Sequence, residues 1–154
     1  MTRPYPYQPG TYDPATGKQP GLETFYALSK RRWKFTGLGT WVVRLMHGKP
    51  YLSTHATGNA CDLGYGTSSA ERQKAVQACQ WFVIHNFKLG VVSIHDYSAP
   101  GNPRGWRCDR GEWVTYRDGE LGAGGRWLHI ELDPAHGSMS AREYEKIWRS
   151  LPRP

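Results

Sequence analysis

The chain has 154 residues, of which 38% are hydrophobic, and a formal net charge of +7 from 20 basic and 13 acidic side chains. This length favours one domain with one core, and no apolar run approaches the roughly 20 residues of a membrane-spanning helix. The positive charge favours a polyanionic partner, such as nucleic acid, an anionic membrane surface or the bacterial cell wall. Three cysteines without a Cys-x-x-Cys pattern argue against a disulfide framework, although one Cys61–Cys108 bridge stays open.

The first part of the chain differs in composition from the rest. Residues 1–20 are rich in Pro, Gly, Tyr and Thr, which predicts an extended N-terminal arm ahead of a domain over residues 21–154. This arm has no apolar segment of the kind that a secretory signal peptide needs. After Gly21, apolar residues at near-helical spacing predict one short helix. The basic cluster at 30–34 is either the solvated end of that helix or a contact to an anionic polymer.

The remaining elements are predicted from periodicity and from helix-start signals. Strands are predicted at 41–45, 91–95 and 127–132. Capping boxes that begin at Ser68 and Ser140 predict a helix to about residue 88 and a C-terminal helix. One face of the first of these helices is expected to be buried, and it consists of Ala75, Val76, Cys79, Phe82, Val83 and Phe87. Gly90 is expected to end the helix.

The segment Ser-Thr-His-Ala-Thr-Gly-Asn-Ala-Cys-Asp at 53–62 carries the clearest chemical signal. Its His55 and Asp62 offer an imidazole and a carboxylate, which both suit a zinc ion. The small residues between them let the backbone turn and leave space for a substrate, and Gly58 can adopt a positive φ at no steric cost. The alternative interpretation is a polar turn in which His55 is hydrogen-bonded locally.

The pattern Ser-x-His-x-x-Gly-x-Ala-x-Asp in this segment resembles the first zinc-binding motif of bacterial and phage peptidases that cut peptidoglycan stem peptides. That family includes zinc D-Ala-D-Ala carboxypeptidases and L-alanyl-D-glutamate endopeptidases. The segment Trp-Leu-His-Ile-Glu-Leu at 127–132 is similar to the family's closing strand. The resemblance covers roughly residues 38–134. It implies an α+β fold, a small antiparallel sheet with packed helices in a single domain.

The resemblance also implies roles for individual residues. His55, Asp62 and His129 would bind Zn²⁺, with water in the fourth position of a catalytic site. Arg44 and Ser53 would bind the substrate. A planar guanidinium such as that of Arg44 matches a carboxylate group with two parallel hydrogen bonds.

The chain departs from the family at the catalytic base. The family places Glu, Asp or His two or three residues before the third ligand, where this chain has Trp127 and Arg126, and neither can accept a proton. Glu131 is the predicted replacement, because residues two apart on a strand face the same side and it would lie beside His129. Its alternative role is to support His129. Further candidates for the base are Asp118, Glu120 and His95.

Three functions are compatible with these residues. The leading hypothesis is a zinc-dependent peptidase acting on cell-wall peptidoglycan, as a phage endolysin or virion-associated lysin. Without a signal peptide, such an enzyme is expected in the phage virion or in the host cytoplasm with release to the cell wall, and the N-terminal arm could attach it to a phage particle. The second is a catalytically impaired zinc-binding module that recognises the cell wall. Nucleic-acid binding ranks third, because the basic residues are scattered rather than in one stripe.

Overall fold

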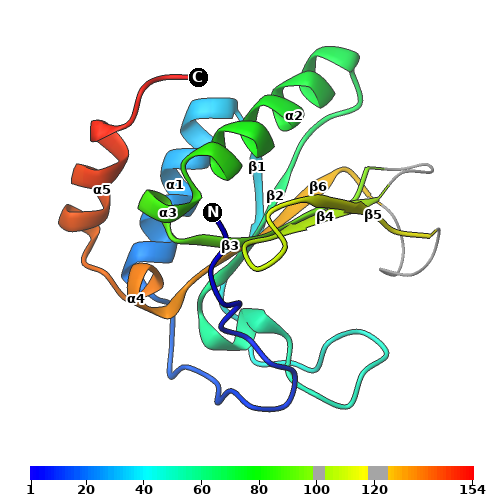
Figure 1. Ribbon diagram of the computed structural model, residues 1–154, viewed down its shortest axis with the longest axis vertical. Coiled ribbons are helices and arrows are strands. Elements are labelled where there is room, and N and C mark those ends of the chain that lie inside the picture. Colours follow the sequence, from blue (N-terminus) through cyan, green and yellow to red (C-terminus); the bar gives the residue numbers. More distant parts are fainter. Residues whose placement is uncertain (99–102, 118–124) are drawn as a thin grey trace.

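The computed structural model describes residues 1–98, 103–117 and 125–154. They form a single α+β domain, in which one antiparallel sheet carries packed helices, so the fold class expected from the sequence is confirmed (Figure 1). Within the described ranges, no helix has both the length and the apolar character needed to cross a membrane. Asp118 and Glu120, two of the candidate bases, lie outside the described residues.

The sheet places the last strand of the chain at its centre. Its strands are β1 (Thr36–Gly39), β2 (Ala60–Gly64), β3 (Val91–Asp96), β4 (Arg104–Arg107), β5 (Trp113–Thr115) and β6 (Trp127–Leu132). They lie in the order β1-β2-β6-β3-β4-β5, and every neighbouring pair is antiparallel. The helices are α1 (Pro20–Trp33), α2 (Ser69–Ile84), α3 (Asn86–Leu89), α4 (Pro134–Gly137), α5 (Ala141–Ser150) and the 3₁₀ helix η1 (Thr54–Thr57).

The two faces of the sheet have different coverings. Helices α1, α2, α3 and α5 lie on one side, and the N-terminal arm and η1 lie on the other (Figure 1). Alternation along β6 sends Leu128, Ile130 and Leu132, all fully buried, to the helical side. His129 and Glu131 therefore face the side of the arm and η1, as the alternation in the sequence predicts.

An aromatic cluster joins the helices on the covered side. The ring of Phe82 in α2 lies 5.1 Å from that of Phe25 and 5.0 Å from that of Trp33 in α1, measured between centroids. Trp81 of α2 and Trp148 of α5 lie 4.9 Å apart. Edge-to-face and tilted pairs of this kind add stability beyond the area that they bury. The cluster locks α1, α2 and α5 into one layer and so holds the sheet in place.

The predicted capping boxes are present, but the long helix is broken. Ser68 accepts a hydrogen bond from the amide of Glu71, whose carboxylate accepts one from the amide of Ser68; Ser140 and Glu143 repeat the arrangement. His85, with φ −102° and ψ 16°, ends α2 and begins α3 in a new phase. The prediction that Phe87 is buried is therefore wrong: it is 42% exposed, and Leu89 enters the core in its place.

The strand predicted at 41–45 is also wrong. The edge strand is β1, and residues 41–44 pair with no strand, while Leu45 makes only an isolated bridge to Leu52. Val42 and Val43 are 42% and 50% exposed, so these β-branched side chains have no sheet to pack on. Strand propensity reflects such packing rather than an intrinsic preference of the backbone. The segment instead turns toward η1, where the amide of Val42 donates to the carbonyl of His55.

The N-terminal arm packs against the domain although residues 1–19 contain no helix or strand. Arg3 forms an ion pair with Asp133 at 3.0 Å and also donates to backbone carbonyls of the domain. Tyr7 is only 4% exposed, and its hydroxyl donates to the carbonyl of Leu132 at the end of β6. The arm thus covers part of the sheet face that carries His129 and Glu131.

Asp96 is a buried anion held by two arginines. It has no solvent exposure, receives two hydrogen bonds from Arg72 of α2 at 2.8 and 2.9 Å, and receives one from Arg104 at 3.1 Å. A hydrogen-bonded pair with its neighbour His95 is not formed, because adjacent residues on β3 point to opposite faces. The network ties α2 to the sheet.

We expect Asp96→Asn to lower the free energy of unfolding by about 2–4 kcal/mol, because two guanidinium groups lose their shared counter-charge. This is somewhat less than for a fully buried pair, since the side chains of Arg72 and Arg104 keep 34% and 29% exposure. Urea unfolding measures the change. Asp109→Asn, which breaks the surface pair of Asp109 with Arg107, is the matched control and should cost less than about 1 kcal/mol. Equal losses in the two variants would contradict the role of Asp96.

Candidate metal centre

His55 is oriented by the turn that carries it. Ser53 caps η1, its hydroxyl accepting from the amide of His55, and Gly58 ends η1 with φ 74°, a conformation that favours glycine. The Nδ1 atom of His55 lies 2.6 Å from the carbonyl oxygen of Thr40. Because a carbonyl only accepts, Nδ1 carries the hydrogen. The other nitrogen, Nε2, therefore faces Asp62, with its Oδ2 atom 3.2 Å away.

Strand pairing brings the other two predicted ligands together. Asp62 of β2 and His129 of β6 are directly opposite each other in the ladder, which places their side chains side by side on one face. His129 Nδ1 lies 2.9 Å from Asp62 Oδ1. His55 and His129 approach Asp62 from different elements, and their ring centroids are 4.9 Å apart.

Glu131 lies on the far side of His129 from Asp62. Its Oε1 atom is 3.1 Å from His129 Nε2, and its Oε2 atom accepts a hydrogen bond of 2.5 Å from the hydroxyl of Tyr5. Glu131 is 3% exposed, and both of its carboxylate oxygens take part in hydrogen bonds that are shielded from solvent. This geometry is that of a group that orients a histidine ligand. The catalytic role of Glu131 stays a prediction.

The ionisable side chains of this group shift one another's pKa values. Burial by itself lowers the pKa of His129, but its hydrogen bonds to Asp62 and Glu131 outweigh burial and raise this pKa to about 10. Burial raises the pKa of Asp62, while its contacts with His129 and His55 bring it well below the usual range. Burial also raises the pKa of Glu131, but the hydrogen bond from His129 outweighs it and lowers this pKa to about 2, so both carboxylates are ionised beside His129. Such a pocket favours a cation at the position between Asp62 and the two rings.

The donor set suits a zinc ion. Within the described residues, His55, Asp62 and His129 are the one group of three or more metal-ligating side chains, and their ligand atoms lie within 4.8 Å of one another. Tetrahedral ligands about 2.0–2.1 Å from zinc are about 3.4 Å apart, and the two contacts of Asp62 with the histidines, at 2.9 and 3.2 Å, are close to this spacing. The side chain of Asp62 keeps 22% exposure, which leaves the site open to solvent on that side.

The two predicted substrate-binding residues have different settings. Ser53 is 4% exposed and serves as the cap of η1. Arg44 is exposed, and its guanidinium makes one long hydrogen bond of 3.4 Å, to the carbonyl of Leu45. Burial raises the pKa of Tyr97 and the charge of Asp62 raises it further, while the charge of Arg44 lowers it. The backbone of Arg44 lies next to Ser53, because its carbonyl accepts a hydrogen bond from the amide of Ser53.

His95 lies next to the group on the neighbouring strand. It is opposite His129 in the β3–β6 ladder, with 5.7 Å between ring centroids. Its Nδ1 atom is buried and has no hydrogen-bond partner among the described residues, and Nε2 lies 3.3 Å from the hydroxyl of Ser93. Burial lowers its pKa to about 4, so the ring is neutral at pH 7.

Tyr5 is the residue of this site that the sequence did not indicate. It is one of several tyrosines in the Pro-rich arm, and no spacing or motif distinguishes it from Tyr7 or Tyr12. The two positions at which the family's base is expected hold an exposed Arg126 and Trp127, whose ring stacks on that of Tyr97.

Comparison with known proteins gives no information about this site. No protein-family model matches the chain, and neither the curated proteins nor the solved structures include a match. What is established is a buried group of two histidines and one aspartate that could hold a metal ion.

Proposed function

We propose that this protein is a zinc-dependent peptidase that cleaves the stem peptides of peptidoglycan. One observation carries the proposal: His55 Nε2, Asp62 and His129 Nδ1 converge, and the second nitrogen of each ring is anchored by another group. These ligands come from the motif Ser-x-His-x-x-Gly-x-Ala-x-Asp and from the segment at 127–132, whose resemblance to peptidoglycan peptidases indicates the substrate class.

In this proposal, each residue around the site has its own role. Zinc held by His55, Asp62 and His129 would lower the pKa of a bound water to about 7 and polarise a peptide carbonyl. The carbonyl of Thr40 keeps the hydrogen of His55 on Nδ1, and Glu131 accepts the hydrogen of His129 Nε2. Arg44, which is exposed and whose backbone pairs with that of Ser53, would hold a carboxylate of the stem peptide.

A second function is favoured by the missing base. Positions 126 and 127 hold Arg and Trp, and both oxygens of Glu131 are already engaged. A zinc-binding module that recognises wall peptides without cutting them would need no proton carrier. For the peptidase, His95 with its unpartnered Nδ1 is a described alternative to Glu131, beside Asp118 and Glu120.

We extend the proposal to the biological setting of a phage endolysin or virion-associated lysin. The net charge of +7 favours contact with an anionic cell wall. Release to the wall would follow host lysis or carriage on the particle, with the N-terminal arm as a candidate attachment segment.

Digestion of purified peptidoglycan tests the proposal. The zinc-loaded protein, the chelated protein and an Asp62→Asn variant are incubated with bacterial walls, and the soluble fragments are identified by mass spectrometry. We expect new peptide ends within the stem peptides with zinc-loaded protein alone. Zinc binding and wall binding without new ends would establish the recognition module, and failure to bind zinc would overturn both functions.

The role of Arg44 gives a sharper test of substrate binding. Arg44→Lys keeps the charge but loses the planar fork, so we expect affinity for a stem peptide to fall by about 10-fold with little change in zinc affinity. Calorimetric titration with a soluble stem peptide measures the change. Arg142→Lys, at an exposed position on α5, is the matched control and should bind as the parent does. Unchanged affinity in Arg44→Lys would remove Arg44 from the binding site.

A further inference from the structure

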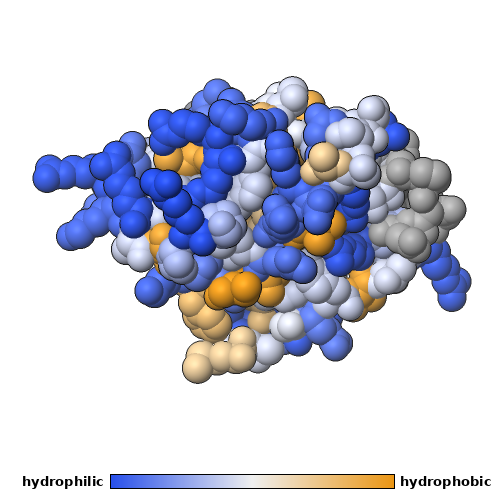
Figure 2. All heavy atoms as spheres, turned by 90° about the horizontal axis from the view of Figure 1, so that it is seen from above, coloured by the Kyte–Doolittle hydropathy of each residue, from blue (hydrophilic) through white to orange (hydrophobic). Residues whose placement is uncertain are grey.

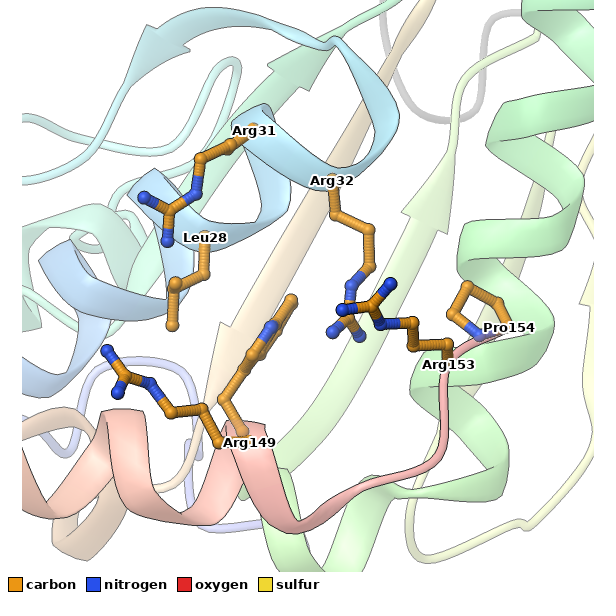
Figure 3. A pocket seen from close by; sticks show the side chains of 7 residues that line it. Leu28, Arg31, Arg32, Arg149, Arg153 and Pro154 are labelled. Atoms are coloured by element: carbon orange, nitrogen blue, oxygen red, sulfur yellow. The ribbon is translucent and has the colours of Figure 1, made fainter.

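A hollow lies where α1 and α5 end, apart from the metal group. Its volume is about 440 Å³. It is lined by Leu28, Arg31 and Arg32 of α1, Trp148 and Arg149 of α5, and Arg153 and Pro154 after α5 (Figure 3). Figure 2 looks down on this end of the molecule and shows hydrophilic side chains gathered on the side where α5 lies. The basic cluster at 30–34 is thus both the end of α1 and one wall of an arginine-lined hollow.

Arg32 is held in a fixed orientation within this arginine pocket. Its guanidinium carbon lies 4.7 Å from the ring centroid of Trp81 and 4.5 Å from that of Trp148. Its Nη1 atom is buried and has no hydrogen-bond partner in the described part of the chain. A planar cation fixed between aromatic rings presents its donors without first losing conformational freedom.

Most arginines of the pocket have no ion-pair partner in the described part of the chain. Arg149 pairs with Glu145 at 2.8 Å, but among the described residues no carboxylate forms an ion pair with Arg31, Arg32 or Arg153. The guanidinium groups of Arg32 and Arg153 lie next to each other (Figure 3), and burial together with the charge of Arg153 lowers the pKa of Arg32. The carbonyl ends of α1 and α5 offset only part of this charge.

We propose that the arginine pocket binds a phosphate group of a ligand that is held without base stacking. Several guanidinium groups around one hollow match the charge and the multiple acceptor oxygens of a phosphate better than a single carboxylate. The nearby rings of Trp33, Trp81 and Trp148 are 6%, 4% and 4% exposed, so they offer no free face on which a nucleobase could stack. The volume lies within the usual range of about 300–1,000 Å³ for small-ligand sites. This site does not depend on the metal centre.

Titration of the full-length chain with inorganic pyrophosphate and with soluble poly(glycerol phosphate), at one ionic strength, tests the proposal. We expect both to bind, and the double variant Arg31→Gln/Arg153→Gln to bind each at least about 10-fold more weakly. The double variant Lys74→Gln/Arg142→Gln removes the same charge from exposed positions outside the pocket and should change affinity less than about 2-fold. Both pairs of side chains are exposed, so thermal unfolding should be unchanged in both variants.

Two results would overturn the arginine pocket as a phosphate site of this kind. Equal losses of affinity in the two double variants would mean that the binding depends on net charge and not on the pocket. Tighter binding of duplex DNA than of poly(glycerol phosphate), at equal phosphate concentration and with the same dependence on Arg31 and Arg153, would assign the pocket to nucleic acid instead.

Discussion

Glu131→Gln is expected to weaken zinc binding by about 10–100-fold while the domain stays folded. The carboxylate accepts the hydrogen of His129 Nε2 at 3.1 Å, and a support of this kind makes the imidazole a better ligand. Glutamine keeps the shape but loses the charge. Competition for zinc with a chromogenic chelator measures the affinity, and wall-lytic rate is recorded on the same preparation.

The alternative role of Glu131 leads to a different result. A general base at this position would leave zinc affinity intact, while the rate would fall by about 100-fold or more. Tyr5→Phe separates the two roles further, because it removes the hydrogen bond of 2.5 Å to Glu131 without touching the strand. If Glu131 supports His129, Tyr5→Phe should also weaken zinc binding, but by a smaller factor than Glu131→Gln. Full zinc affinity with full rate in Glu131→Gln would exclude both roles and turn attention to His95, Asp118 and Glu120.

Zinc is expected to stabilise the protein, and Asp62→Asn is expected to remove most of that stabilisation. At a zinc concentration 100 times the dissociation constant, the gain is about 2.7 kcal/mol, which corresponds to a rise in Tm of about 5–10 °C for a domain of this size. Asp62 faces both histidines, at 2.9 and 3.2 Å, so its loss should weaken zinc binding by more than about 100-fold, beyond the effect of a supporting residue. Scanning calorimetry with and without zinc measures both quantities.

Asp13→Asn is the matched control for this experiment. Asp13 is exposed in the N-terminal arm, and the substitution makes the same chemical change away from the metal group. We expect its rise in Tm with zinc to equal that of the parent chain. An equal rise in Asp62→Asn would mean that zinc binds elsewhere, and the proposed site would be rejected.

Local signals in the sequence were enough for some of the individual elements. Ser68 and Ser140 begin helices because a hydroxyl and a glutamate three residues later satisfy the free amides of the first turn, an interaction completed within four residues. The alternation along 127–132 likewise specifies which side chains of β6 enter the core. The prediction of a strand at 41–45 was wrong because a strand needs a neighbouring strand, and the strand propensity of a segment does not show whether such a neighbour is present.

The chemical character of the candidate site was also readable from the sequence, but its assembly was not. The types and spacing of His55 and Asp62 indicate metal ligands, and the closing segment indicates His129. Only the antiparallel pairing of β2 with β6 brings Asp62 opposite His129, across 67 positions of the chain. The contact of Tyr5 with Glu131 spans 126 positions and depends on how the arm crosses the sheet.

The sequence by itself thus determined the capped helices, the buried strand and the kinds of ligand that the chain can offer, because each depends on neighbouring residues. The tertiary structure alone decided three other features: the pairing of Asp62 with His129, the contact of Tyr5 with Glu131 and the proximity of Arg32 to Arg153. Each of these joins segments that no periodicity connects. Strand register and helix packing bring these segments together, and both minimise the exposed apolar surface of the whole domain.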